Sequence, residues 1–448
     1  MTAVGLDFGT TNSSTALFEK SKIRLFVLDL HNFNPNILPS FLYITREFKH
    51  FIGSQAVQEY LERETNRPVF WEKRKVGQVQ VTVAGRGGGP ITYWDDLIIE
   101  IDTAARGRLL QSIKTALRDT KYDGTQIFER FYTIEELIAL IMRHLKKGAE
   151  EVINSSVDTV VIGRPVMFSE NPETDARAQE KLLLAARQAG FKNIQFELEP
   201  IAAAYVYHQD AIERENVLIF DFGGGTLDMT VMEVGGATNP KVLSTEGVLI
   251  GGDDLDRVFM QPLVRYFGEG STFDDDLPFP SYIIGMLSNW QNMVDLSTPR
   301  YREIISRIKQ TSSNPEAINR LEALVNKNLG FKLYRAFEKA KIDLSSKLYT
   351  LLRFDEDIIH IHEGITRQQF ESLISDKLVV VEHAIDEVVL KSGLKPDQVT
   401  AVLRTGGSSE IPAFIEIMER KFGTKKVKAL SPFTTIVGGL AIRASEIS

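Results

Sequence analysis

The chain has 448 residues, which allows two or three domains of ordinary size. Its 43% hydrophobic and 25% charged residues are typical of a globular protein and exclude disorder for most of the chain. The 52 basic and 60 acidic side chains leave a formal net charge of -8, which argues against a broad basic face, so we expect no nucleic-acid partner. Cysteine is absent, which excludes disulfides, thiolate metal ligands and cysteine nucleophiles.

No membrane segment or signal peptide is predicted. The longest apolar stretches fall far below the roughly 18 residues that a membrane span needs. The opening sequence, MTAVGLDFG, lacks the basic start and the apolar core of a signal peptide and is typical of a strand. We therefore expect a cytoplasmic protein without a membrane partner.

The elements predicted along the chain alternate between strands and helices. Short β runs open it: VGLDFG, STALFE, IRLFVLDL and LPSFLYIT. Thr133 and Glu136 form a capping box that begins an amphipathic helix, TIEELIALIMRHLKKGAEEVI. The strand DTVVIGRPV, a helix ended by Gly190 and the strand NIQFELEP follow. This alternation predicts an α/β protein, with a helical insertion at about 266–330. Within that insertion FPSYIIGMLSNW, at 279–290, predicts a packed helix, with a partner surface as the alternative.

An internal echo is the strongest organisational signal. Residues 4–18, VGLDFGTTNSSTALF, are answered by residues 218–232, LIFDFGGGTLDMTVM. Each copy has an apolar strand, Asp-Phe-Gly, a turn of small residues and a second apolar strand. A duplicated lobe is the economical explanation.

The two turns carry the predicted chemistry. Glycine permits the backbone angles that let N–H groups converge on an anion, so two facing turns predict a polyphosphate site. Carboxylates repel phosphates, so Asp7 and Asp221 fit such a site only with a divalent cation, which we expect to be Mg²⁺. The paired turns therefore predict a nucleotide and metal site.

Nine ordered blocks carry a resemblance to a known family. They are GLDFGTTNS at 5–13, KR at 73–74, RPVMF at 164–168, EPIAAAY at 199–205, DFGGGTLD at 221–228, IGGDDLD at 250–256, EKAKIDLSS at 338–346, ITRQQFE at 365–371 and RTGGSSEIP at 404–412. In these blocks the chain resembles the ATPase domain of DnaK-type chaperones, the heat-shock protein 70 family of the actin and sugar-kinase superfamily, and most of all its short YegD-like members. The resemblance implies a two-lobed, duplicated ribonuclease-H-like fold of the actin type, with a nucleotide cleft between the lobes. Lobe I would cover 1–213, with a closing helix at 430–448 returning to it, and lobe II would cover 214–429.

The resemblance also assigns roles to residues. The phosphates would be bound by Thr10, Thr11, Asn12, Gly223, Gly224, Gly225 and Thr226, and the metal by Asp7 and Asp221. The catalytic group would be Lys73, Glu199, Thr226 and Asp228. The adenosine would contact Gly406, Gly407 and Ser408, and its ribose and base would contact Glu338, Lys341 and Ser345.

Two departures from the family pattern stand out. Ile342 and Glu410 lie where the family has arginines that stack on the adenine. After SPFTTIVGGLAIRASEIS, at 431–448, we expect no peptide-binding module like the one that follows in the family's chaperones.

Three functions stay open from the sequence. The first is a Mg²⁺-dependent ATPase that uses its nucleotide state as a chaperone-related switch, with a co-chaperone or a client protein as its partner. The second is a module that senses nucleotide or docks a partner with little hydrolysis. The third is a small-molecule kinase of the same superfamily. The histidines of HIHEG, at 360–364, indicate either a metal cluster or, as we prefer, a solvated strand face before a helix capped by Thr366.

Overall fold

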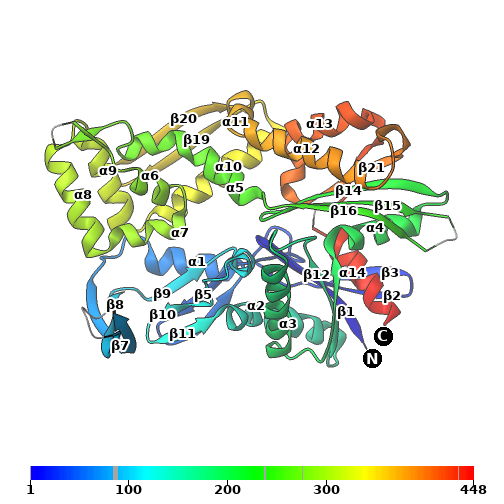
Figure 1. Ribbon diagram of the computed structural model, residues 1–448, viewed down its shortest axis with the longest axis horizontal. Coiled ribbons are helices and arrows are strands. Elements are labelled where there is room, and N and C mark those ends of the chain that lie inside the picture. Colours follow the sequence, from blue (N-terminus) through cyan, green and yellow to red (C-terminus); the bar gives the residue numbers. More distant parts are fainter. Residues whose placement is uncertain (1, 84–88, 237–238, 275, 432, 448) are drawn as a thin grey trace.

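Two large β-sheets with the same strand topology form the centre of the computed structural model (Figure 1), which describes residues 2–447 except 84–88, 237–238, 275 and 432. The first sheet runs β13-β12-β1-β2-β3, with β4 also beside β2, and the second runs β22-β21-β14-β15-β16. In each sheet three strands are parallel and the last two turn back as antiparallel hairpins. The two similar sequence segments therefore lie at equivalent places in two sheets of the same topology.

The strands of the two sheets have the following bounds. The first sheet contains β1 Ala3–Phe8, β2 Asn12–Glu19, β3 Lys22–Leu25, β4 Leu38–Pro39, β12 Thr159–Arg164 and β13 Asn193–Leu198. The second contains β14 Glu215–Phe222, β15 Leu227–Val234, β16 Lys241–Val248, β21 Ala401–Thr405 and β22 Val427–Ala429.

Helices α4 (Glu199–Asp210) and α14 (Thr435–Glu446) pack between the sheets. Helix α14 contacts β1, β2 and α4, while α4 also contacts β14 and β15. Small residues allow this close approach: a Cβ on Gly5 would lie 2.3 Å from the backbone nitrogen of Ala441, and one on Gly439 would lie 1.7 Å from the carbonyl oxygen of Ala202. The last helix of the chain thus packs against its first strand.

The predicted capping box and helix ends are confirmed. Helix α2 (Ile134–Ile153) begins after Thr133, whose hydroxyl accepts from the Glu136 backbone while the Glu136 side chain accepts from the Thr133 backbone. Helix α3 (Pro172–Gln188) ends just before Gly190, which has a positive φ of 100°. Both helices pack over the first sheet because their apolar faces are buried with those of its strands.

Smaller elements extend from the first sheet. They are the three-stranded sheet of β5 Leu42–Thr45, β6 His50–Ile52 and β9 Gly107–Leu110, helix α1 Ser54–Glu64, the hairpins of β7 Trp71–Val83 with β8 Ile91–Asp102 and β10 Gly124–Ile127 with β11 Arg130–Thr133, and the 3₁₀ segment η1 Ile113–Arg118.

A largely helical region extends from the second sheet. Its elements are α5 Gly252–Met260, η2 Gln261–Phe267, β17 Thr272–Phe273, β18 Leu277–Pro278, α6 Ser281–Leu287, α7 Trp290–Met293, η3 Asp295–Ser297, α8 Pro299–Thr311, α9 Pro315–Asn326, α10 Gly330–Ser346, β19 Tyr349–Glu356, β20 Ile359–Thr366, α11 Arg367–Leu373, α12 Ser375–Lys391, η4 Pro396–Gln398, η5 Gly407–Glu410, α13 Pro412–Phe422 and η6 Thr424–Lys426. The segment 279–290 is packed, as expected, since Ile283, Leu287 and Trp290 are buried. Among the described residues, no helix is both long and apolar enough to cross a membrane.

Two neighbouring glycines of α14 give a matched test of this packing. We expect Gly439→Ala to destabilise the fold by about 3 kcal/mol or more, because its new methyl group meets the rigid backbone of Ala202. Gly438→Ala should be nearly neutral, because its methyl crowds only the end of the Ile23 side chain, makes ordinary contacts with other side-chain atoms, and alanine favours the helix by about 1 kcal/mol. Denaturant unfolding of both variants checks this; equal effects would contradict the packing.

Candidate functional site

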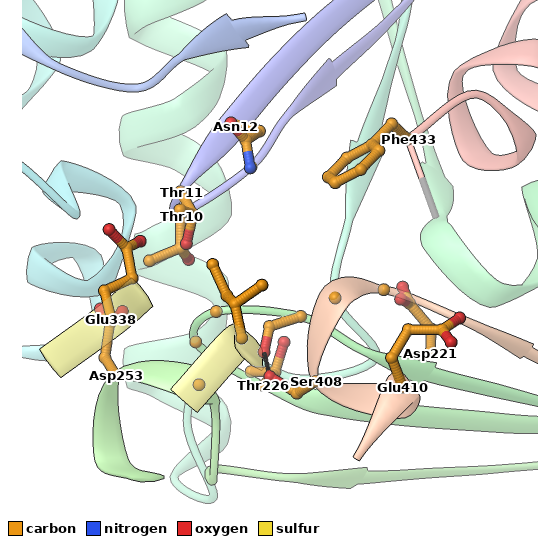
Figure 2. A pocket seen from close by; sticks show the side chains of 18 of the residues that line it. Thr10, Thr11, Asn12, Asp221, Thr226, Asp253, Glu338, Ser408, Glu410 and Phe433 are labelled. Carbon is orange, nitrogen blue, oxygen red and sulfur yellow. Dashed lines mark hydrogen bonds between the residues drawn. The ribbon is translucent and has the colours of Figure 1, made fainter. Parts of the chain in front are cut away.

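A cavity of about 520 Å³ lies where the two central hairpins meet. Its walls contain sixteen of the eighteen predicted site residues: Asp7, Thr10, Thr11, Asn12, Glu199, Asp221, Gly223, Gly224, Gly225, Thr226, Glu338, Lys341, Ser345, Gly406, Gly407 and Ser408. In Figure 2, Thr10, Thr11 and Asn12 come from the first hairpin and lie across the cavity from Thr226, Ser408 and Asp221. The structure thus brings together residues from both copies of the echo.

The two turns lie in direct contact. The first turn is residues 9–11, between β1 and β2, and the second turn is residues 223–226, between β14 and β15. A Cβ on Gly224 would lie 2.1 Å from the Thr11 hydroxyl oxygen, and one on Gly225 would lie 2.6 Å from the Thr10 hydroxyl oxygen. Any larger residue at these two positions would push the hairpins apart.

The glycines of the second turn allow the two turns to approach each other. They do not supply the left-handed backbone angles that the sequence predicted. Among the described glycines with positive φ, none belongs to the second turn. The expectation that Gly223, Gly224 and Gly225 are needed for left-handed angles is therefore wrong. Gly224 and Gly225 are needed because a Cβ at either position would fill the space that the threonines of the first turn occupy, whereas a Cβ at Gly223 would make only an ordinary contact with Thr226 O at 3.8 Å.

The carbonyl groups of both turns are tied back into the protein. Ser40 donates its backbone N–H to Thr11 O at 2.8 Å and its hydroxyl to Gly9 O at 2.9 Å. The first residues of α5 do the same for the second turn, since Gly252 N donates to Gly223 O and Asp253 N to Gly224 O.

Four amides of the turns are left for a ligand, while the Gly223 N–H donates to Thr226 O within its own turn. Among the described residues, the structure gives no acceptor for the backbone N–H groups of Thr10, Thr11, Gly224 and Gly225. Unpaired amides that converge in a turn are an anion-binding arrangement.

Several carboxylates share the floor of the cavity. Burial raises the pKa of Asp7 and of Asp221 above the ordinary range, and the nearby carboxylate of Glu199 raises both further. Burial likewise raises the pKa of Asp228 to about 7, with Glu199 again contributing. Such a group keeps its negative charge at neutral pH only at a cost in free energy, so it favours a cation.

Lys114 supplies one cation, and the sequence analysis missed it. Its Nζ donates to Glu199 Oε1 at 2.6 Å, and both side chains are at most 10% exposed. Burial alone would lower the pKa of this ammonium, but the carboxylates of Glu199 and Asp7 outweigh that effect and raise it, so the group stays charged. Lys114 is the second residue of η1 and lies in the apolar run LLQSIKTAL.

Lys73 is not at the site, which corrects its assignment to the catalytic group. It lies exposed on β7, opposite Glu100 of β8, in the long hairpin that precedes β9. The short KR match pointed to the wrong lysine, because both of its residues belong to an exposed hairpin of alternating polar and apolar residues. A lone lysine in the apolar run around Lys114 was the better signal, since a buried lysine needs a carboxylate partner.

Asp228 lies behind the cavity wall and not on it. Its carboxylate accepts from the Val166 backbone N–H at 2.6 Å and from the side chain of Thr226. It is paired with Asp221 across the hairpin. Asp228 therefore acts on the cavity through its charge and through Thr226.

The donor set fits Mg²⁺ held largely by water. Among the described residues, no group of three or more acidic, histidine or cysteine side chains has the spacing of a metal cage. Asp7 and Asp221 offer two carboxylates on the ends of facing strands. Mg²⁺ commonly takes one or two carboxylates and completes its shell with water and phosphate oxygens, so these residues suit it.

The far end of the cavity is built from α10 and from the loop after β21. Lys341 Nζ lies 2.8 Å from Asp256 Oδ1, and the Ser408 hydroxyl donates to Gly223 O at 3.2 Å. Gly406 has a φ of 80°, which lets the loop turn beside Phe222. Glu338 and Ser345 complete this wall.

The two residues that lie where the family has stacking arginines also line the cavity. Ile342 is exposed, and Glu410 forms an ion pair with Arg404 at 2.6 Å. Phe433 also reaches this cavity, as Figure 2 shows. In the described part of the chain, no arginine is among the residues that line this cavity.

Another residue that sequence reasoning missed is Arg118 of η1. Its guanidinium donates to Gly225 O at 2.7 Å, and Arg118 lies outside the cavity lining. This bond ties η1, beside the first sheet, to the second turn. No motif in the sequence marked it.

The preferred interpretation of HIHEG as a strand face is confirmed. His360 and His362 lie on β20 with exposed side chains, and both contact Asp355 on β19. Thr366 forms the capping box of α11, as expected.

Comparison with known proteins identifies the family. The model of the Hsp70 protein family matches residues 3–277 and 308–447. The chain belongs to the Hsp70 family. It is 25% identical to the chaperone protein DnaK of one strain of Thermus thermophilus and 24% identical to that of a second strain, in alignments that cover 99% of this chain. The chain spans 61% of the length of these relatives. The two sheets are thus the duplicated core of the actin-like ATPase fold of Hsp70 proteins.

The raised carboxyl pKa values give a test at the level of stability. In the absence of a cation, the folded chain binds more protons at Asp7, Asp221 and Asp228 than the unfolded chain does, so stability falls as pH rises through the folded-state pKa values. We expect Asp221→Asn, which removes one buried charge, to raise the melting temperature by about 2 °C or more near pH 8 and to raise it clearly less near pH 5, where the folded chain still holds the proton.

Thermal unfolding without metal or nucleotide measures this difference. Asp123→Asn is the control, because Asp123 is an exposed carboxylate whose pKa is lowered by Lys181. An equal effect of Asp221→Asn at both pH values would contradict the electrostatic account.

Proposed function

We propose that the protein binds ATP with Mg²⁺ in this cavity and hydrolyses it to ADP and phosphate. The observation that carries the proposal is the contact between two turns with unpaired amides, beside a buried lysine and carboxylates. Membership of the Hsp70 family supports it.

The turns would grip the phosphates from both sides. The amides of Thr10 and Thr11 would face one side of the chain of phosphates, and those of Gly224 and Gly225 the other. Asn12 and the Thr226 hydroxyl add polar groups at the rim. Because Ser40 and α5 hold the carbonyls away, the ligand meets donors and few acceptors.

The catalytic group would be Lys114, Glu199, Thr226 and Asp228. The Lys114 ammonium would stabilise the charge that develops on the phosphoryl oxygens. Glu199, whose carboxylate is held by Lys114 at 2.6 Å, would orient the attacking water and accept its proton. Asp228 would hold the Thr226 side chain toward the cavity.

Asp7 and Asp221 would hold Mg²⁺ through its water shell. When bound, the cation would offset the charge of the phosphates and of the two carboxylates. This role explains why acidic side chains lie beside an anion site.

The nucleoside would lie at the far end of the cavity. Gly406, Gly407 and Ser408 would receive the adenosine, and Glu338, Lys341 and Ser345 would contact its ribose and base. Ile342 and Glu410 give the base no guanidinium to stack on, a loss worth about 0.5 to 2 kcal/mol for each arginine.

The hydrolysis would drive a conformational switch. Both turns contribute to one ligand, so the nucleotide state changes the contacts that join the two halves of the molecule. We propose a chaperone-related role, with a co-chaperone or client protein as the partner that reads this state. The division into lobes at 213/214 and the likeness to YegD-like proteins stay predictions.

Two lysines provide the test of the catalytic assignment. We expect Lys114→Ala to reduce the turnover of Mg²⁺-ATP by a factor of about 100 or more, because a preorganised cation is lost from the transition state. Lys73→Ala, the matched control, should keep the wild-type rate, since Lys73 is exposed on β7.

A phosphate-release assay beside calorimetric titration with ATP and ADP measures both steps. Equal rates for wild type and Lys114→Ala would contradict the assignment. Tight binding by the wild type without release above a metal-free control would instead favour a nucleotide-sensing module.

A further inference from the structure

The long β-hairpin of β7 and β8 extends away from the rest of the molecule. Its base is anchored, because Arg67 pairs with Asp102 at 2.5 Å and the Phe70 backbone N–H donates to Asp102 Oδ1 at 3.0 Å. Among the described residues, no third strand pairs with β7 or β8, and Figure 1 shows both strands at one end of the lower half, away from the two central sheets. A ribbon of two strands has two open edges, and each can accept another strand.

The distal part of this hairpin, residues 77–83 and 91–97, has one apolar face. Residues directly opposite each other in an antiparallel pair share a face, so the register assigns to this one Val79, Val81 and Val83 of β7, and Ile91, Tyr93 and Leu97 of β8. All of these side chains except Val81 are exposed. The other face is polar, and on it Gln78 Nε2 donates to Asp96 Oδ1 at 3.0 Å. Because a hairpin of two strands is only marginally stable in water, an exposed apolar face of this kind favours the addition of further strands.

The two edges of the hairpin differ in charge. On β8, Asp95 and Asp96 follow each other near the middle of the strand, so a second copy of β8 laid antiparallel on this edge would bring like charges together. On β7, residues 76–83 are VGQVQVTV, without a charged residue or a proline. Natural proteins usually protect an open strand edge with charges or proline. The β7 edge lacks this protection, and the β8 edge has it.

The basic residues of β7 lie nearer to its base and already face carboxylates of the same chain. Lys75 pairs with Asp96 at 2.5 Å. Arg74 pairs with Glu129, and Lys73 lies opposite an acidic residue of β8. An acidic strand of another molecule would therefore find no unmatched cation here. The charges favour a partner strand that is itself uncharged, and the distal part of β7 is such a strand.

We propose that β7 pairs antiparallel with β7 of a second copy of this chain, which joins the two hairpins into one four-stranded sheet. A register centred on Gln80 places Val79 of each copy opposite Val81 of the other, on one face. The same register places Gln78 opposite Thr82, so apolar residues meet apolar residues and polar residues meet polar ones. Both copies use the same strand, so the contact is a closed two-fold one and produces a dimer. None of these residues lines the cavity, so the dimer does not depend on nucleotide.

Sedimentation velocity of the full-length protein tests this contact. We expect a reversible equilibrium of monomer and dimer in the micromolar range, because the contact is small. Val79→Lys should raise the dissociation constant of the dimer about ten-fold or more, since it removes an apolar pair and adds like charges on both sides of the two-fold axis. In the monomer the new ammonium lies opposite Asp95, so the hairpin itself should stay folded.

Tyr93→Lys is the matched control. Tyr93 lies on the same face as Val79, and each is 45% exposed, but Tyr93 belongs to β8, away from the contact. Its dissociation constant should stay within about three-fold of wild type. An equal effect of both substitutions would identify the apolar faces as the contact and would overturn the pairing of the β7 edges.

A crosslink reads the register directly. The chain has no cysteine, so Gln80→Cys introduces a single thiol, at the residue that faces its own copy across the two-fold axis. Mild oxidation should join this variant into a covalent dimer, because residues opposite each other on antiparallel strands are within disulfide distance. Thr92→Cys, on the same polar face of β8, should crosslink far more slowly. Wild-type protein that stays monomeric at every concentration, assembly that continues beyond a dimer, or equal crosslinking of both variants would overturn the proposal.

Discussion

The contact between the two hairpin turns is the constraint on which the rest of the structure depends. Gly224 and Gly225 leave no Cβ, so Thr10 and Thr11 come within contact of the second turn. Ser40 and the start of α5 bind the carbonyls of the turns, and the amides stay free for an anion. Both sheets, and the helices between them, position these few backbone groups.

Electrostatics then fixes what the site accepts. Asp7, Asp221 and Asp228 are buried close to Glu199, and their pKa values are raised. Lys114 offsets part of this charge through its bond with Glu199. Under the proposed function, a polyphosphate with a divalent cation would supply the remaining positive charge at the carboxylates and the negative charge at the amides, so one ligand would satisfy both.

The fold and the positions of most site residues could be predicted from the sequence, because the duplication is visible both in the sequence and in the topology of the sheets. The echo of Asp-Phe-Gly predicted two equivalent hairpins, and the sheets have the same topology. The residues of the turns and those that the family resemblance assigned to the nucleoside line one cavity.

Other features depend on tertiary packing and left no local pattern. Lys73 lies in an exposed hairpin, and Lys114 lies in an apolar run. The short KR match favoured Lys73, which lies outside the site. Arg118 and Ser40 act through hydrogen bonds to backbone carbonyls, which any residue provides. The buried rings of Tyr60 and Phe331 lie 5.5 Å apart although their positions in the chain are more than 200 residues apart, and only the fold brings them together.

The central claim is that both turns bind the same ligand. Hydrogen–deuterium exchange of the full-length protein, with and without Mg²⁺ and a non-hydrolysable ATP analogue, tests it most directly. The account predicts that peptides containing Thr10 and Thr11 and peptides containing Gly224 and Gly225 become protected together, at the same ligand concentration. Protection of one turn while the other exchanges at its ligand-free rate would contradict it.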